Sequence, residues 1–405
     1  PAIAADWQAT VAAHAAPVAA TPDTVLDAIL QDAAERAHQR GIAALMTGAK
    51  PVTGRPALQA AFCIDVRSEV FRRALEAQDP AIATIGFAGF FGLTLAHRGP
   101  GTDEVAAHLP VLLNPGFHSH SHAAAPVEEA TRIAARTTRA WGRFRQAAVS
   151  SFAFVEAAGP AYAAKLVTSS LGLGQGDKAP DPAPEFDTAL APEVKAATGA
   201  AVLKAMSMQE GHARLVLLLG HGAQVTNNPH ESAYHCGACG GQTGEVSARL
   251  LARLLNDPET RAGLAAHGVT VPADTLFIAG LHDTTTDEIT LYQDDPAPAH
   301  AADLQAARDW LARAAKAARA ERAARLPGAT GANVTARALD WAEVRPEWGL
   351  AGCAAFIAAP RAVTSGADLQ GRAFLHSYDW QADAGFGTLE LIITCLLYTS
   401  PSPRD

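Results

Sequence analysis

The chain alternates between short, almost uninterrupted apolar runs and longer segments in which apolar residues recur every three or four positions. Three apolar runs predict buried strands: Ala57 to Ile64, Ala213 to Gly220 and Thr275 to Leu281. The run from Pro80 to Ala96 holds three glycines and falls short of the ~20 apolar residues of a membrane-spanning helix. It therefore predicts a buried strand followed by a glycine loop.

Helical periodicity fills most of the remaining chain and predicts helices over residues 5–48, 68–78, 126–159, 192–208, 243–255 and 300–325. Thr21-Pro22-Asp23 is typical of a helix start, and Ser68 is the expected N-cap of its helix. Strands that alternate with helices predict an α/β fold with a largely parallel β-sheet flanked by helices.

Several segments between these elements read as loops or boundaries. Gly172 to Phe186 is rich in Gly, Pro and Asp, and is the best candidate for an internal boundary or insertion. Asn227-Asn228-Pro229 and Gly237 to Gly241 predict a tight-turn loop. Gly387 to Thr394 begins like an amphipathic helix, but the pattern breaks at Cys395. Residues 395–405 share no composition with the alanine-rich body, and we expect them to be a non-native tail.

Composition and charge narrow the class of protein. A chain of 405 residues that is 49% hydrophobic can bury a large core. The net charge of -9 argues against a nucleic-acid partner. Five cysteines, two of them in a Cys-x-x-Cys, indicate reduced thiols, some of which serve a metal. We expect a soluble or peripheral protein rather than an integral one.

The first candidate site is Cys63-Ile64-Asp65-Val66-Arg67. Alternate positions on or just past a strand share a face, so the thiol, carboxylate and guanidinium converge. A thiolate beside Asp65 needs a counter-charge, which a metal ion or Arg67 would supply. The alternative is a buried core cysteine next to a structural Asp65–Arg67 ion pair. A cysteine phosphatase would need Cys-x5-Arg, but Glu69 occupies that place.

The second candidate site runs from His221 to Cys236-Gly237-Ala238-Cys239. His221 directly follows an apolar strand, and Cys236 lies in a glycine cluster typical of metal knuckles. Together with Cys63 they supply the ligand set of a catalytic Zn²⁺ site, whose open position Asp65 and Arg67 could control. The alternative is a closed structural zinc site in which Cys239 is the fourth ligand.

Other polar clusters have more ordinary interpretations. His118, His120 and His122 alternate with serine after Pro115 and are expected in a solvated loop, with metal binding as the lesser alternative. His282, with Asp283 and Asp287, follows a strand; it is either a group that supports the site or substrate, or part of a helix-cap cluster. Cys353 is expected to be a buried thiol.

Four motifs in order carry a resemblance to a known family: CIDVRSE from Cys63, GFAGFFG from Gly86, GHGAQVTNNPHESAYHCGACGG from Gly220 and LHDTTTDE from Leu281. They resemble the DabA family, the large zinc-binding subunits of a two-component bacterial system that accumulates inorganic carbon. Family members are longer, so the chain resembles an internal fragment. The resemblance implies a β-carbonic-anhydrase-like core with large helical insertions.

The resemblance also implies an organisation and a ligand set. Residues 1–56 would be a truncated helical segment, and 57–394 a zinc-binding domain with an insertion around 100–210. The zinc ligands would be Cys63, His221 and Cys236, with Asp65 as the fourth ligand in a closed state that ends when Asp65 pairs with Arg67. The 15 positions between His221 and Cys236 are wider than the β-carbonic anhydrase spacing.

The implied function is energy-coupled uptake of CO₂ or bicarbonate. Zn²⁺ would activate water for attack on CO₂, and hydration would be vectorial because a membrane-embedded cation- or proton-translocating partner (DabB-like) drives it. Anhydrase activity is then expected only in the coupled system, on the cytoplasmic side of the inner membrane, with the chain bound peripherally. The alternatives are a stand-alone zinc hydrolase or lyase, and a non-catalytic scaffold subunit that zinc stabilises.

Overall fold

The computed structural model describes residues 2–46, 54–147, 151–170, 181–224, 231–340, 343 and 352–399. The chain divides into two compact units, Pro1–Gly48 and Ala49–Asp405. The first unit holds two helices, α1 (Ala2–Ala15) and α2 (Pro22–Leu45). Thr21 caps α2, as the sequence predicted, because its hydroxyl accepts a hydrogen bond from the backbone N–H of Thr24.

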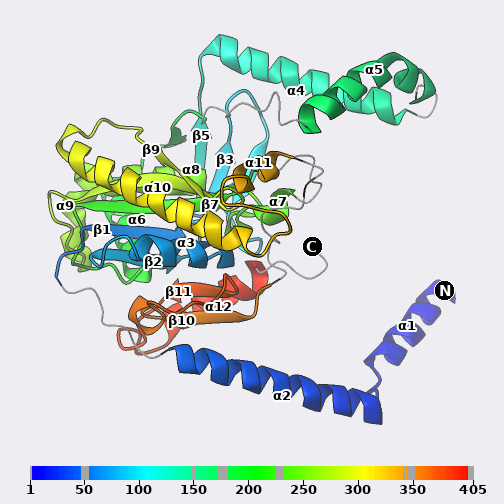
Figure 1. Ribbon diagram of the computed structural model, residues 1–405, viewed down its shortest axis with the longest axis horizontal. Helices are drawn as coiled ribbons and strands as arrows, with labels where there is room; N and C mark the ends of the chain where they lie inside the picture. Colours follow the sequence, from blue (N-terminus) through cyan, green and yellow to red (C-terminus); the bar gives the residue numbers. More distant parts are fainter. Residues whose placement is uncertain are drawn as a thin grey trace. The chain divides into compact units, whose positions relative to one another are not determined.

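The second unit is built around a five-stranded sheet (Figure 1). Its order is β2-β1-β7-β8-β9, and the bounds are Ile82–Phe87, Leu58–Cys63, Leu215–Gly222, Leu276–Asp283 and Glu288–Tyr292. The first four strands are parallel, and β9 runs antiparallel to β8. All four strands predicted from the apolar runs are therefore present, and the α/β fold with a largely parallel sheet is confirmed.

Helices cover both faces of this sheet. The apolar core on one face includes side chains from α3 (Val66–Glu76) and α10 (Ala301–Ala323). The core on the other face includes side chains from α6 (Pro192–Ala205), α8 (Glu245–Asn256) and α9 (Pro258–Leu264). Strand β7 contributes alternate residues to the two cores, which explains why a buried parallel strand appears in the sequence as a continuous apolar run.

The order of the strands creates a switch point between β1 and β7. The chain leaves β1 through α3 toward β2, whereas it leaves β7 through α8 toward β8 on the other side. Because α3 and α8 lie on opposite faces, the two connections diverge at the carboxyl ends of β1 and β7. Open α/β sheets bind their ligands in the crevice at such a point.

The remaining described strands form two smaller sheets. One has four strands in the order β4-β3-β5-β6, with bounds Val105–His108, Leu95–Arg98, Phe117–Ser121 and Pro184–Phe186. The other pairs β10 (Ala355–Ala359) with β11 (Ala373–Ser377) in parallel. The second of these sheets approaches β2 closely, since a Cβ atom on Gly86 would lie 1.7 Å from the carbonyl oxygen of Leu375.

The remaining described elements are helical. The α-helices are α4 (Ala125–Gln146), α5 (Ser151–Ser170), α7 (Glu231–Tyr234), α11 (Val334–Leu339) and α12 (Gly387–Thr399). The 3-10 helices are η1 (Gly237–Cys239), η2 (Ala265–His267), η3 (Pro298–His300) and η4 (Arg361–Val363). Among the described helices, none combines the length and the apolar character that a membrane span requires.

The structure corrects four expectations about local elements. The segment with His118 and His120 is strand β5 rather than a loop, because it pairs with β3 and buries its serines, and His122 comes directly after the strand. Residues 184–186, expected in a loop, form β6 on the other side of β5. The helix expected over 126–159 is two helices, since α4 ends where Ala147 turns extended. The helix expected to break at Cys395 runs to Thr399.

Two predicted loops fall partly or wholly on residues outside the described part of the chain. These are residues 172–180 of the Gly/Pro-rich segment and the turn at Asn227-Asn228-Pro229.

Candidate metal centre

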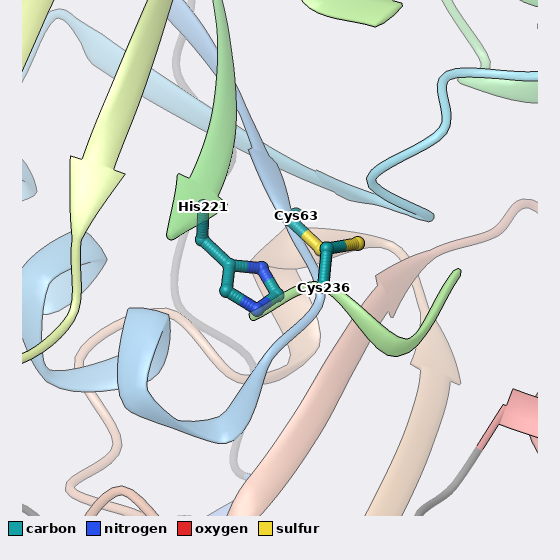
Figure 2. Close-up of side chains that lie close together, drawn as sticks. All are labelled: Cys63, His221 and Cys236. Atoms are coloured by element: carbon teal, nitrogen blue, oxygen red, sulfur yellow. The ribbon is translucent and has the colours of Figure 1, made fainter. Parts of the chain in front are cut away.

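Three predicted ligands meet at the switch point of the main sheet (Figure 2). Cys63 is the last residue of β1, and His221 lies next to the end of β7. Cys236 comes just before η1 and is held by a β-bridge to Gln242. All three are buried, and their ligand atoms lie within 4.8 Å of one another. The sheet topology therefore gathers donors that are far apart in the sequence.

The geometry of these donors fits a zinc ion. The Sγ atoms of Cys63 and Cys236 are 3.8 Å apart, and two thiolates bound to tetrahedral zinc at about 2.3 Å lie about 3.8 Å from each other. Both ring nitrogens of His221 are buried without a hydrogen-bond partner among the described residues. A buried imidazole without partners is costly, and a metal ion would satisfy it.

Without a cation, the two thiols hold their protons. The hydrogen bond with Cys236, together with burial, raises the pKa of Cys63 well above its ordinary value. The hydrogen bond with Cys239, together with burial, raises the pKa of Cys236 in the same way. A pair of thiolates is therefore favourable here only when a cation compensates their charge.

Glycine makes room for the two sulfur atoms. A Cβ atom on Gly89, in the loop after β2, would lie 2.6 Å from the Sγ atoms of both Cys63 and Cys236. Any side chain at this position would therefore fill the space between the thiols. Gly89 lies in the glycine loop that the sequence predicts, but no motif in the sequence marks it as part of the site.

Asp65 and Arg67 form a buried pair beside the cluster. Asp65 Oδ1 accepts hydrogen bonds from the backbone N–H of Arg67 at 2.9 Å and from its Nε at 2.6 Å, while Oδ2 accepts one from Nη2 at 2.7 Å. Burial alone would raise the pKa of Asp65, but the charge and hydrogen bonds of Arg67 outweigh it and hold the pKa well below its ordinary value. Asp65 is therefore a carboxylate at neutral pH.

The capping of α3 differs from the prediction. Asp65 is the N-cap, because its side chain accepts from the backbone N–H of Arg67. The hydroxyl of Ser68 instead donates to the carbonyl oxygens of Cys63 and Asp65 at 2.9 and 2.6 Å. Ser68 thus ties the end of β1 to the first turn of α3.

Asp65 lies next to the three donors but is bound to Arg67. Its Oδ2 is 3.6 Å from Nε2 of His221, too far for a hydrogen bond. The Arg67 guanidinium in turn lies 5.9 Å from the centre of the Tyr234 ring, a contact that no sequence pattern indicates. Of the four predicted ligands, the structure brings Cys63, His221 and Cys236 together and leaves Asp65 on the arginine.

Two other cysteines lie outside the three-donor cluster. Cys239 is buried next to Cys236. Cys353, expected to be buried, is exposed, because it precedes β10 and lies outside the paired residues of that sheet.

His282 lies beside His221 in the neighbouring strand, since the two residues are partners in the β7–β8 register. Its Nε2 is 3.2 Å from Oδ1 of Asp287, which also pairs with Arg322. Its ring centre lies 4.8 Å from that of Phe71. His282 is thus a buried neighbour of the three-donor cluster, and Asp287 holds its imidazole ring in place. Asp283 caps the turn between β8 and β9 rather than a helix.

Comparison with known proteins gives one consistent result. The family model described as "Probable inorganic carbon transporter subunit DabA" matches residues 2–399. Three similar proteins of that same description come from Azorhizobium caulinodans (60% identical over 403 residues), Rhodospirillum centenum (59% over 397) and a Methylobacterium species (61% over 402). These alignments cover 96–97% of this chain.

The same alignments cover only 49–50% of the three relatives, so the chain spans about half the length of the curated proteins that it matches. No solved structure matches the chain.

Proposed function

Because the chain belongs to the DabA family of probable inorganic carbon transporter subunits, we propose that it binds zinc and takes part in the uptake of inorganic carbon. The reaction would be vectorial hydration of CO₂, driven by a membrane-embedded cation- or proton-translocating partner. The observation that carries the proposal is the buried cluster of Cys63, His221 and Cys236, whose spacing and orphaned imidazole fit zinc.

Cys63, His221 and Cys236 would hold the ion at the switch point. When bound there, Zn²⁺ would supply the Lewis acidity that activates water for attack on CO₂. The surroundings suit a small apolar substrate, since Ala88, Ala238 and Phe90 pack around the cysteines. They also exclude bulk water, which strengthens the interaction of the donors with a cation.

Asp65 is the group that would control access to this site. Its carboxylate is bound to Arg67 but lies within 3.6 Å of His221, so a short movement would bring it to the donor cluster and close the site. Separating a buried ion pair costs on the order of 3–5 kcal/mol. The closing movement is therefore unfavourable by itself and suits a switch that an external energy source drives.

Such control fits the proposed coupling. An anhydrase whose site is always open brings CO₂ and bicarbonate to equilibrium and accumulates neither. A site that opens only in one state of a cation-translocating partner makes hydration effectively one-way. In this arrangement the chain is a peripheral subunit on the cytoplasmic side of the inner membrane, next to a DabB-like partner.

The test of the metal site is elemental analysis of the purified chain and three variants. We expect about one zinc per chain in the parent and in Asp65→Asn, and little or none in Cys63→Ser. Cys353→Ser is the matched control, because it removes an exposed thiol by the same substitution and should keep its zinc. A folded parent chain without zinc would contradict the proposal.

A second measurement separates the proposal from its two alternatives. Rapid, reversible CO₂ hydration by the isolated chain would favour a stand-alone zinc enzyme over a coupled subunit. Bicarbonate uptake in cells that carry the partner should be lost in both Asp65→Asn and Arg67→Gln. Uptake that survives both substitutions would favour a non-catalytic scaffold.

A further inference from the structure

Helices α4 and α5 lie against each other as a hairpin (Figure 1). The contact is aromatic, because Phe154 of α5 packs against Trp141 and Phe144 of α4 with ring centres 5.6 and 5.4 Å apart. No residue of α4 is buried, and in the described part of α5 only Phe154 and Ala158 are. The hairpin thus leaves most of its surface uncovered.

One face of α4 is a stripe of arginines. Arg132, Arg136, Arg139 and Arg143 follow one another at intervals of four, three and four residues, which places them on the same side of the helix. Arg132 pairs with Glu128 at 3.2 Å. Among the described residues, none forms an ion pair with the other three arginines, so their charge is available to a ligand.

The hairpin is a basic region in an acidic protein. Residues 125–170 hold six basic and three acidic side chains, a net charge of +3, whereas the whole chain carries -9. From residue 130 to the end of α4, the sequence contains no acidic residue. The segment is therefore suited to a negatively charged surface.

Apolar side chains are exposed next to this charge. On α4, Trp141 is 52% exposed and lies opposite the arginine stripe, whereas Ile133 is 54% exposed and lies about a quarter of a turn from it. On α5, Phe152, Val155, Tyr162 and Leu166 are 77%, 66%, 40% and 51% exposed. Their spacing of three, seven and four residues places them along one face of α5.

Arginines along one side of a helix, with exposed aromatic and aliphatic side chains on the other faces of the hairpin, are typical of helices that lie in the surface of an anionic bilayer. We propose that the α4–α5 hairpin binds the anionic surface of a lipid membrane, with the arginines on lipid phosphates and the apolar side chains in the boundary between head groups and acyl chains. A lipid surface suits these features better than a protein partner does, because it requires periodic charge and apolar stripes but no complementary groove. This surface is separate from the metal centre.

The experiment is co-sedimentation of the purified chain with lipid vesicles. We expect binding to vesicles of 70% phosphatidylcholine and 30% phosphatidylglycerol, little binding to pure phosphatidylcholine, and weakening in 0.5 M NaCl. The variant Arg136→Glu/Arg139→Glu/Arg143→Glu should lose at least tenfold in partitioning. The matched control, Arg40→Glu/Arg98→Glu/Lys316→Glu, makes the same change in net charge at exposed positions elsewhere and should bind like the parent.

A second variant tests the apolar half of the surface. Val155→Ser/Leu166→Ser alters only exposed side chains and should reduce binding to the anionic vesicles severalfold at unchanged charge. Circular dichroism and the thermal midpoint establish that each variant is folded. In the parent, brominated lipid should quench Trp141 emission, and Trp141→Phe provides the background from the other tryptophans.

Three results would overturn the proposal. One is equal binding to neutral and anionic vesicles, and another is binding that the arginine variant leaves intact. The third is the absence of binding to protein-free vesicles when the chain does bind membranes that contain the other transport subunit; this result would assign the hairpin to a protein partner. None of these results depends on whether the chain binds zinc, so they leave the proposed function untouched.

Discussion

Gly89 sets how much space lies between the two buried thiols. Its Cα hydrogen points to where a Cβ atom would lie 2.6 Å from both Cys63 Sγ and Cys236 Sγ. Both sulfur atoms belong to segments that are themselves fixed, Cys63 at the end of a central strand and Cys236 by its bridge to Gln242. The thiols therefore cannot retreat cheaply from a larger residue.

This contact makes Gly89→Ala a sharp test of the site. The added methyl group should occupy the space between the sulfurs and weaken zinc binding by at least tenfold, as competition with a chromophoric chelator would measure. The fold should persist, since the change lies in a loop beyond the sheet. Gly99→Ala is the matched control, because the nearest atom to its Cβ would be Thr102 Cγ2 at an ordinary 3.7 Å. Equal zinc affinity in both variants would contradict this assignment.

Local sequence patterns predict some of the site residues but not those whose role depends on contacts between distant parts of the chain. Cys63 and His221 could be predicted because each follows an apolar run, and the ends of parallel strands meet at one edge of the sheet. The roles of Gly89 and Tyr234 could not, because each depends on a contact with a residue distant in the sequence. Ser68 was the wrong cap because Asp and Ser are about equally good N-caps, and α3 begins at Val66, which puts Asp65 rather than Ser68 at the N-cap position.

At the scale of elements, strands buried on both faces were predictable, whereas β5 and β6 of the four-stranded sheet were not. The runs at β1, β7 and β8 are apolar throughout because helices cover both sides. Strand β5 alternates histidine with serine, and β6 is only three residues long, so neither carries an apolar signal. Strand β5 depends on its pairing with β3, and β6 on its pairing with β5, and in each case the partner strand lies elsewhere in the sequence.

The packing of β2 against β11 gives a prediction at this scale. In Gly86→Ala, the new Cβ would lie 1.7 Å from the backbone oxygen of Leu375, so the two elements must separate. We expect a loss of several kcal/mol in the free energy of unfolding, of the order seen when a core is overpacked or more. Urea denaturation followed by circular dichroism would measure it.

Gly199→Ala in α6 provides the contrast. Its Cβ would meet side-chain methyl groups rather than backbone, with Leu255 Cδ2 and Thr260 Cγ2 at 3.2 Å and Leu264 Cδ2 at 3.6 Å, and alanine favours a helix by about 1 kcal/mol over glycine. The variant should therefore stay close to the parent in stability. If Gly86→Ala were equally mild, β2 and β11 would not be in backbone contact.

At the scale of the whole molecule, buried histidines couple stability to pH. Burial lowers the pKa of His97, His108, His212 and His376 to about 4. In the unfolded chain these groups titrate near 6.5. The unfolded state therefore binds more protons between these two values, and acid shifts the equilibrium toward it.

We expect the free energy of unfolding to be constant with respect to these groups above about pH 6.5 and to fall as the pH drops toward 4. The slope is at most about 1.4 kcal/mol per pH unit for each histidine. His212→Phe should reduce the slope by up to that amount, because His212 already packs against Phe277. The exposed His267→Phe controls for the loss of an imidazole as such. Urea unfolding measured at intervals from pH 7 to 4.5 would give the dependence of the free energy of unfolding on pH. If its slope in His212→Phe were the same as in the parent, the argument would be refuted.

The pairing of β1 with β7 also determines when, during synthesis of the chain, the main sheet can form. The candidate ligands Cys63 and Cys236 are separated by 173 positions, and β1 gains its second neighbour only when β7 has been made. During synthesis, an apolar strand with an open edge and a reactive thiol must therefore wait for most of this sheet to emerge from the ribosome. If the cluster binds a metal as proposed, loading would be one of the last events of folding, and the yield of metal-bound chain would depend on what shields β1 and keeps Cys63 reduced in the interval.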